Sequence, residues 1–181
     1  NGNTTAVAYD GNGNVISVTD GEGRQVRYAY DLADRLTEAM AGDASYENRN
    51  TYTYDEVGNL ISTTDGNGNK MTYTYDLLSN QTSRTNALGE TESYSYNLNN
   101  RLEKITRPNG NTIQYDYNKL DALLQTDYSE EADGQVLYTY DEEGKRLSMS
   151  DLTGTSTYQY DADGRITGCL LYTSPSPRDK R

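Results

Sequence analysis

Apolar and polar residues alternate in short segments along this chain. Residues 71–75 read Met-Thr-Tyr-Thr-Tyr, and residues 113–117 read Ile-Gln-Tyr-Asp-Tyr. A period of two is typical of a β-strand that is buried on one side only. Segments rich in Gly and Asn, such as 65–69 and 108–111, separate the alternating ones. Because Gly and Asn tolerate the positive φ of tight turns, the pattern predicts short strands joined by turns.

The alternating segments recur at a nearly fixed spacing. A tyrosine followed by Asp or Asn ends such a segment in eight places: Tyr9, Tyr30, Tyr54, Tyr75, Tyr96, Tyr117, Tyr140 and Tyr160. The steps between them are 21, 24, 21, 21, 21, 23 and 20 residues. A turn such as 55–59, a second apolar segment such as 60–63 and another turn complete each repeat. The repeat is therefore a β-hairpin, and because one hairpin is marginal in water, each must stack on its neighbours.

Stacking would align the tyrosines in two ladders, in which the rings pack and the hydroxyls reach water or a partner. The first ladder contains Tyr28, Tyr52, Tyr73, Tyr94, Tyr115, Tyr138 and Tyr158, and the second contains Tyr30, Tyr54, Tyr75, Tyr96, Tyr117, Tyr140 and Tyr160. The predicted structural tyrosines are Tyr9, Tyr28, Tyr30, Tyr52, Tyr54, Tyr73, Tyr75, Tyr94, Tyr96, Tyr115, Tyr117, Tyr138, Tyr140, Tyr158 and Tyr160. The fold class predicted from the pattern is all-β, with tandem β-hairpins forming an extended antiparallel sheet.

Some segments depart from the pattern. Residues 31–41 and 120–133 are richer in Leu, Ala and Glu and could form helices, but they stand where neighbouring repeats place a turn and a second strand, so strands are predicted. Residues 77–81, 99–101 and 120–122 lack the turn glycine, and residues 129–134 lengthen one turn. These departures leave the local register open.

Composition and charge narrow the choice of partner. The chain is only 33% apolar and has no Trp or Phe, a composition that would suit a disordered chain if the tyrosine spacing did not argue for order. Its net charge of -12 disfavours nucleic acid and anionic membrane surfaces as partners. The sequence has no apolar stretch long enough to insert into a membrane and no N-terminal signal peptide. We expect a fragment whose export signal lies elsewhere.

The last residues differ from the rest of the chain. Residues 169–179 closely resemble the translation of a transposase sequencing adapter, although a natural Ser/Pro linker is the alternative. We therefore expect a repeat array over residues 1–168, with about eight repeats and both ends truncated, and a non-native tail over 169–181. Cys169, the only cysteine, lies in this tail, and the chain has no His. Disulfides, thiol catalysis and the common transition-metal sites would then lack ligands.

The acidic turns are candidates for metal or catalytic sites. An EF-hand loop needs Gly at its sixth position and Glu at its twelfth, but the loop from Asp65 has Lys70 and Asp76 there. Paired carboxylates could serve glycoside hydrolysis, yet Asp and Glu recur at the turns of every repeat, where capping explains them. We predict no catalytic residue, no metal site and no cofactor.

The segment 52–60, Tyr-Thr-Tyr-Asp-Glu-Val-Gly-Asn-Leu, and the segment 158–166, Tyr-Gln-Tyr-Asp-Ala-Asp-Gly-Arg-Ile, resemble the Rhs or YD repeat. The resemblance covers about residues 5–168. This family includes bacterial Rhs polymorphic toxins, toxin-complex C components, wall-associated proteins and teneurins. The resemblance implies a long, curved sheet that is part of a spiral β-shell, which in the toxins encloses a C-terminal toxic domain. The family's self-cleaving core segment and toxin domain are absent from this sequence, so no catalytic residue can be carried over.

The family resemblance implies a non-catalytic segment of the encapsulating shell of an Rhs-type polymorphic toxin, secreted or at the cell surface. Its implied partners are neighbouring repeats of the parent protein and an encapsulated C-terminal toxin domain. One alternative is a cell-wall-associated or adhesin-like protein that binds glycans or contacts cells, since exposed Tyr, Asn and Asp suit sugars. Another is a degraded repeat remnant. We expect frayed ends or edge-to-edge association, because the terminal hairpins lack capping neighbours.

Overall fold

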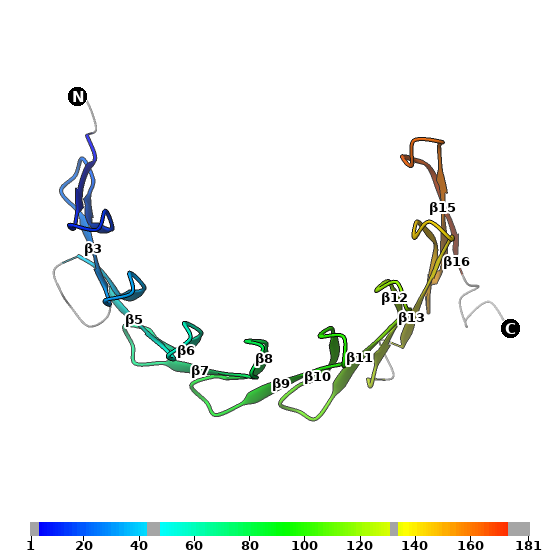
Figure 1. The fold of residues 1–181 in the computed structure, drawn as a ribbon, viewed down its shortest axis with the longest axis horizontal. Helices are drawn as coiled ribbons and strands as arrows, with labels where there is room; N and C mark the ends of the chain where they lie inside the picture. Colours follow the sequence, from blue (N-terminus) through cyan, green and yellow to red (C-terminus); the bar gives the residue numbers. More distant parts are fainter. Residues whose placement is uncertain (1–3, 43–47, 131–133, 174–181) are drawn as a thin grey trace, which may run out of the picture. The chain divides into compact units, whose positions relative to one another are not determined.

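The computed structural model describes residues 4–42, 48–130 and 134–173. These residues form sixteen strands, and within each of the two compact units, residues 1–91 and 92–181, the strands follow one another in chain order. The paired strands are antiparallel, and the sheet curves within each unit (Figure 1). The predicted all-β class and the antiparallel array of tandem hairpins are confirmed.

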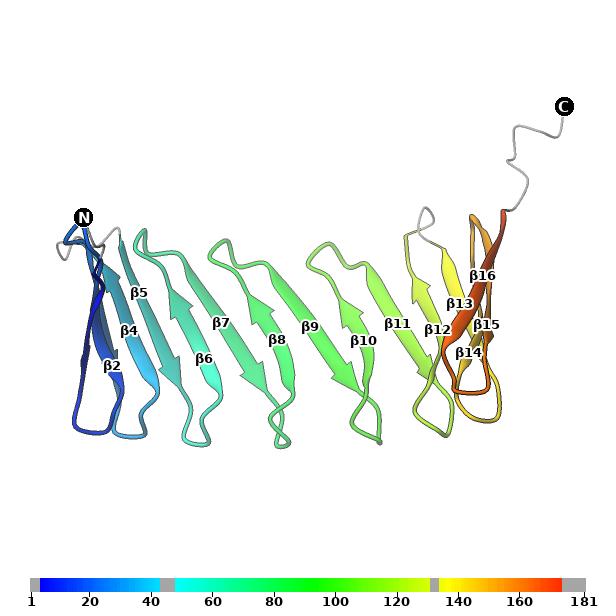
Figure 2. The ribbon, with the colours of Figure 1, turned by 90° about the horizontal axis from the view of Figure 1, so that it is seen from above.

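The first unit contains the strands up to β8. They are β1 Ala6–Tyr9, β2 Val15–Thr19, β3 Gln25–Tyr30, β4 Leu36–Ala41, β5 Arg49–Tyr54, β6 Leu60–Thr64, β7 Lys70–Tyr75 and β8 Gln81–Thr85. The second unit contains β9 Thr91–Tyr96, which starts at the boundary, β10 Leu102–Thr106, β11 Thr112–Tyr117, β12 Leu123–Tyr128, β13 Gln135–Tyr140, β14 Arg146–Asp151, β15 Gly154–Tyr160 and β16 Ile166–Thr173. Figure 2 shows consecutive strands side by side, with turns along both edges of the sheet.

Both segments that could have been helices are strands. Residues 36–41 form β4, and residues 123–128 form β12. Each pairs with the strand before it, as in Tyr28 with Ala39 and Tyr115 with Thr126. The prediction of strands is therefore confirmed, because pairing and the period-two burial of Tyr override the helix propensity of Leu and Ala.

Pairing differs inside and between hairpins. The hairpin β5–β6 pairs from Thr51 with Thr64 to Tyr54 with Leu60. The next junction, β6–β7, pairs over only three residues and stops at Ser62 with Thr72. We call such a junction between consecutive hairpins a seam. The seams β2–β3 and β10–β11 likewise pair over three residues. At each of these seams the pairing covers only the last three residues of the earlier strand, so the first two residues of that strand have no ladder partner across the seam.

A β-bulge follows the turn in each hairpin. In β5–β6, Thr53 pairs with Ser62 and Tyr54 with Leu60, so Ile61 has no opposite residue. The same shift recurs in β1–β2 and β7–β8. A bulge bends its strand and changes the side on which the next residue points. This explains why β2, β6 and β12 can begin with two successive apolar residues, which strict alternation would not allow.

The sheet is a single layer. Among the described residues no hydrophobic side chain is buried, and the buried side chains are Ser62 and Thr126. The apolar strand residues and the tyrosines are mostly half-buried. The fold is consequently held by ladder hydrogen bonds and side-chain stacking along the sheet and not by a compact core.

The end of the chain extends the last hairpin. Strand β16 continues to Thr173 and pairs with β15, with Cys169 opposite Tyr158. Residues 174–181 of the predicted adapter-like tail lie outside the described residues. The boundary at residue 168 and the non-native origin of the tail stay predictions.

Candidate functional site

The paired tyrosines of each repeat lie on one face of the sheet. Tyr73 and Tyr75 are half-buried, whereas Thr74 between them is exposed on the other face. Several rings of the first ladder stand opposite small residues of the neighbouring strand, as Tyr52 does opposite Thr63. A large ring beside a small partner covers the backbone of the sheet, so the tyrosine face is the more apolar of the two.

The hydroxyls of the second ladder close the seams. Tyr75 Oη donates to the carbonyl of Leu60 at 2.9 Å, beyond the last residue pair of seam β6–β7. The same bond joins Tyr30 to Val15, Tyr54 to Leu36, Tyr117 to Leu102, Tyr140 to Leu123 and Tyr160 to Arg146, at 2.8 to 3.0 Å. A phenol can both cover the sheet with its ring and donate to a carbonyl that the seam ladder does not reach.

The first ladder behaves differently. Tyr73 Oη lies 3.8 Å from Met71 Sδ, a weak acceptor, and Tyr94 Oη donates to Glu92 Oε1. Burial raises the pKa of Tyr75, Tyr54, Tyr115 and Tyr117, all of which stay neutral donors at ordinary pH. The two ladders therefore share a face but differ in chemistry: the second carries the seam bonds.

A five-residue turn follows the second tyrosine in each repeat. In the turn at Asp55, the Asp55 N–H donates to Asn59 O at 2.9 Å, and the Gly58 N–H donates to Asp55 O at 3.2 Å. Asp55 Oδ1 accepts the N–H of Val57 and of Asn59, and Oδ2 accepts the Asn59 carboxamide. The turn thus satisfies its own polar groups, and the Asp is fully used as its cap.

The copies without glycine keep this turn. Asp34, Ser79, Asn100 and Asp121 take φ values of 58° to 67° at the position that Gly58 occupies elsewhere. Ser79 N–H still donates to Asp76 O at 3.1 Å. The turns that lack glycine therefore have the same register as the other turns. Their cost is the backbone strain of a non-glycine residue in the left-handed conformation.

The turn carboxylates are held in their charged form. The side-chain and backbone hydrogen bonds of Asn69 lower the pKa of Asp65. At Asp55, desolvation raises the pKa, but the bonds from Asn59 and the turn backbone outweigh it, and the net pKa is lowered. A carboxyl whose folded pKa is lowered stabilises the fold above its unfolded pKa, and this stability is lost as the pH falls through the folded pKa.

Arginines at the last turn position connect consecutive repeats. Arg35 Nε bonds to Asp31 Oδ2 at 2.7 Å in its own turn, and Arg35 Nη1 donates to Asp55 O at 2.9 Å in the next. Its guanidinium lies 4.9 Å from the centroid of the Tyr54 ring. Arg101 makes the equivalent contacts with Asn118 O and the Tyr117 ring. Each arginine therefore ties one turn to the ring and backbone of the following repeat.

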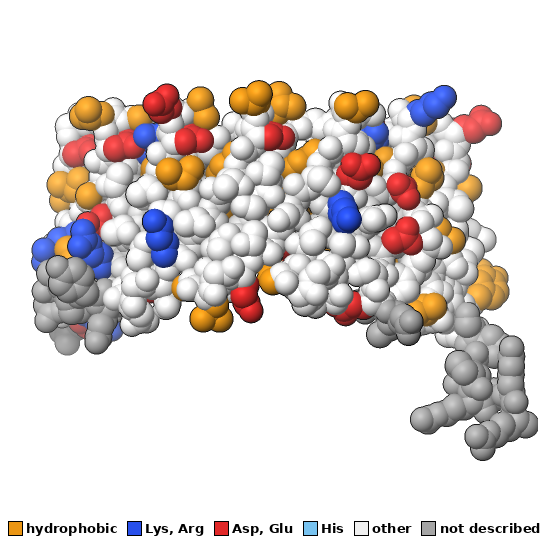
Figure 3. Space-filling model, turned by 90° about the horizontal axis from the view of Figure 1, so that it is seen from below, with side chains coloured by type: hydrophobic (Ala, Val, Ile, Leu, Met, Phe, Trp, Pro, Cys, Tyr) orange, Lys and Arg blue, Asp and Glu red, His pale blue; other side chains and the backbone are white. Residues whose placement is uncertain are grey.

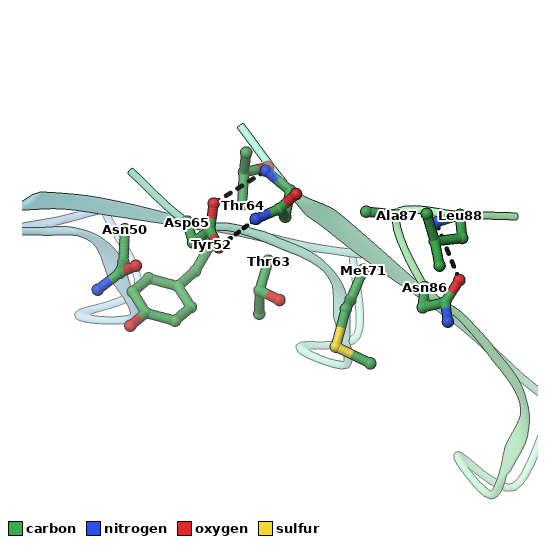
Figure 4. A pocket seen from close by; sticks show the side chains of 10 residues that line it. Asn50, Tyr52, Thr63, Thr64, Asp65, Met71, Asn86, Ala87 and Leu88 are labelled. Atoms are coloured by element: carbon green, nitrogen blue, oxygen red, sulfur yellow. Dashed lines mark hydrogen bonds between the residues drawn. The ribbon is translucent and has the colours of Figure 1, made fainter. Parts of the chain in front are cut away.

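A shallow groove lies on the tyrosine face of the first unit. Its volume is about 540 Å³, and it is lined by Asn50, Tyr52, Thr63, Thr64, Asp65, Asn69, Met71, Asn86, Ala87 and Leu88. Figure 4 shows Tyr52 and Met71 projecting on either side of the smaller Thr63, with Asn86 and Leu88 contributed by the next turn. The Tyr52 ring beside the Asn50 carboxamide is a lining that can stack on and hydrogen-bond a polar ligand.

Other site chemistry is limited in the described part of the chain. Within residues 4–42, 48–130 and 134–173, no group of three or more His, Cys, Asp or Glu side chains could hold a metal ion. The same residues include no helix able to cross a membrane. The sequence pattern did not reveal one feature, a set of exposed Leu and Val side chains at turn tips. These side chains follow five of the eight Tyr-Asp or Tyr-Asn pairs by one or two residues.

Fold and site together define a β-hairpin repeat protein, in which tyrosine hydroxyls and turn arginines join each hairpin to the next. The RHS Repeat family matches residues 9–43 and 54–91. These two matched stretches are therefore RHS repeats. Its sequence matches no curated protein.

Solved structures with the same fold include the TcdB2–TccC3 complex, with a TM-score of 0.55 and 19% identity over 97% of this chain and 9% of that one. A Tc holotoxin pore of Photorhabdus luminescens matches with a TM-score of 0.54 and 19% identity over 94% and 9%. A TcdB2–TccC3–Cdc42 structure matches with 0.54 and 18% over 93% and 9%. The chain thus spans about a tenth of the length of these toxin chains.

Proposed function

We propose that this chain is a non-catalytic wall segment of the encapsulating shell of an Rhs-type polymorphic toxin. The observation that carries the proposal is the single-layer sheet without a buried apolar core, extended by similar seams from hairpin to hairpin. Such a sheet separates two spaces more readily than it forms a pocket for chemistry. The fold shared with toxin assemblies supports the same role.

The occupied carboxylates support a role without catalysis. The Asp55 carboxylate accepts three hydrogen bonds from its own turn, and the Asp65 and Asp76 carboxylates do the same. Acids already engaged in this way are held ionised and are poor proton donors. In the proposed shell, the partners are neighbouring repeats and an enclosed C-terminal toxin domain, and the parent protein is secreted or displayed at the cell surface.

The parent gene provides the direct test. We expect its sequence to continue the repeats and to end in a core segment followed by a C-terminal toxic domain. In the purified parent protein, that domain should resist protease while the shell is intact and become sensitive after the shell is unfolded with urea. A parent that ends soon after residue 168, or a C-terminal domain cleaved equally fast in both states, would contradict the shell role.

A second candidate function is glycan contact by a surface protein. The groove beside Tyr52 favours it, because the aromatic ring can stack on a sugar and the carboxamide of Asn50 can hydrogen-bond to it. A glycan array probed with the full chain and with Tyr52→Ala tests this candidate. Sugar binding that Tyr52→Ala abolishes would support it, and an array without any signal would remove it.

A further inference from the structure

The turns that follow the Tyr-Asp pairs in the first unit present an exposed apolar row. Leu32 and Leu77 are fully exposed, and Val57 and Leu78 are 79% and 70% exposed. We call these four residues the apolar edge. Figure 3 shows hydrophobic side chains gathered along the upper edge of the view, interspersed with Asp and Glu. Side chains this exposed contribute nothing to the folded state by burial, so the fold does not account for them.

The turn itself does not require apolar residues. The turn at Asp10 has the same hydrogen bonds as the turn at Asp55, yet its tip is Gly11-Asn12. The turn at Asp141 carries Glu142-Glu143 at its tip. At the opposite edge of the first unit, the described tips include Glu22 and Asn67, and Leu88 is the apolar exception. The apolar character therefore belongs to one edge and not to the turn type.

Covering these tips would leave few polar groups unsatisfied. In the turn at Asp76, the N–H groups of Leu78 and Asn80 already donate to Asp76 Oδ1 at 2.9 Å, and Ser79 N–H donates to Asp76 O. The turns at Asp31 and Asp55 are satisfied in the same way. A partner that displaced water from the tips would thus gain apolar burial with little cost in lost hydrogen bonds.

The charges around the apolar edge select the partner. The turns 31–35, 55–59 and 76–80 contain five carboxylates, Asp31, Asp34, Asp55, Glu56 and Asp76, against one guanidinium, Arg35. A second copy of the same edge would bring like charges together, which disfavours self-association. A partner with basic side chains flanking an apolar row is favoured instead.

Spacing selects the form of the partner. Neighbouring tips are separated by two strands, or about 10 Å. One heptad of an α-helix advances about 10.5 Å, so apolar residues repeated every seven positions stay in step with successive tips. We propose that the apolar edge of residues 31–78 is a docking surface for a basic amphipathic α-helix of another polypeptide segment, with its apolar stripe on Leu32, Val57 and Leu77.

Peptide binding to the full chain tests this surface. The probe is a synthetic, fluorescently labelled helix of three heptads with Leu in the stripe and Lys at the flanking positions, and its matched control replaces each Leu by Ser. The edge variant carries Leu32→Ser, Leu77→Ser and Leu78→Ser. The control variant carries Leu88→Ser at the opposite edge. Circular dichroism of each protein verifies strand content, which these exposed positions should not alter.

We expect the edge variant to bind the Leu-Lys peptide about tenfold more weakly or worse than the unchanged chain, and the control variant to bind as the unchanged chain does. The Ser-Lys peptide should also bind about tenfold more weakly, because charge alone would hold it. Equal binding by the edge variant, or equal binding of both peptides, overturns the proposal. A dimer that the edge variant abolishes, without peptide binding, overturns it in favour of self-association.

Discussion

Replacing Tyr75 by Phe would remove one seam bond while leaving the ring in place. Tyr75 Oη donates to Leu60 O at 2.9 Å, and the side chain is half-buried, which raises the pKa of its hydroxyl. The ladder of seam β6–β7 stops at Ser62, so the ladder supplies no replacement donor at Leu60. The variant therefore isolates the hydroxyl from the stacking of the ring.

The cost follows from ordinary hydrogen-bond energetics. A neutral intramolecular hydrogen bond contributes about 0.5–1.5 kcal/mol net, and a carbonyl left without a partner costs more as it becomes more buried. Leu60 is half-buried, so water can replace part of the lost bond. We expect Tyr75→Phe to lower the free energy of unfolding by about 1 kcal/mol, which corresponds to a fall in Tm of about 2–4 °C for a chain of this size.

Tyr73 provides the matched control in the same strand. Its ring shares the face with Tyr75, but its hydroxyl lies 3.8 Å from Met71 Sδ, where little hydrogen-bond energy is at stake. Urea denaturation followed by circular dichroism should give Tyr73→Phe a change below about 0.3 kcal/mol. Equal losses in the two variants, or no loss in Tyr75→Phe, would refute the role assigned to the second ladder.

Three further changes test the turns. Asp65→Asn should keep the turn at neutral pH, and because the pKa of Asp65 is lowered in the fold, the variant should lose less stability than the unchanged chain between pH 7 and pH 3, measured by urea midpoints. Ser79→Gly should raise the free energy of unfolding by about 0.5 kcal/mol, since Ser79 has a φ of 63°, and an unchanged or lower urea midpoint would contradict this. Arg35→Lys should lower the free energy of unfolding by about 0.5–1 kcal/mol, because the contacts with Asp55 O and the Tyr54 ring are lost. Thermal melts that match the unchanged chain would show that Arg35 does not stabilise the junction between these repeats.

The sequence was sufficient for the architecture because one pattern was repeated eight times. The period-two segments predicted the strands. Residues two apart in a strand point the same way, so the two tyrosines of a repeat share a face. The stretch 31–41 was resolved by comparison with its neighbours and not by its own propensities, which favour a helix. Repetition thus supplied information that a single copy lacks.

The finer features depend on atoms that the pattern does not specify. The acceptor of Tyr75 lies fifteen residues earlier in the chain and becomes available only because the seam ladder ends at Ser62. The bulge at Ile61 is a matter of register, which two successive apolar residues leave ambiguous. The apolar edge escaped prediction because an exposed Leu in a turn has the same sequence signature as a buried one. Exposure is a property of the assembled sheet.

The seams also bear on how such genes change. The same tyrosine–carbonyl bond recurs at several seams. A hairpin from one position in the array could therefore pair with a hairpin from another position through the same kind of bond. Recombination between two repeats of one gene would then delete or duplicate whole hairpins and still join compatible edges. Repeat number should accordingly differ among related genes in steps of about 21 residues.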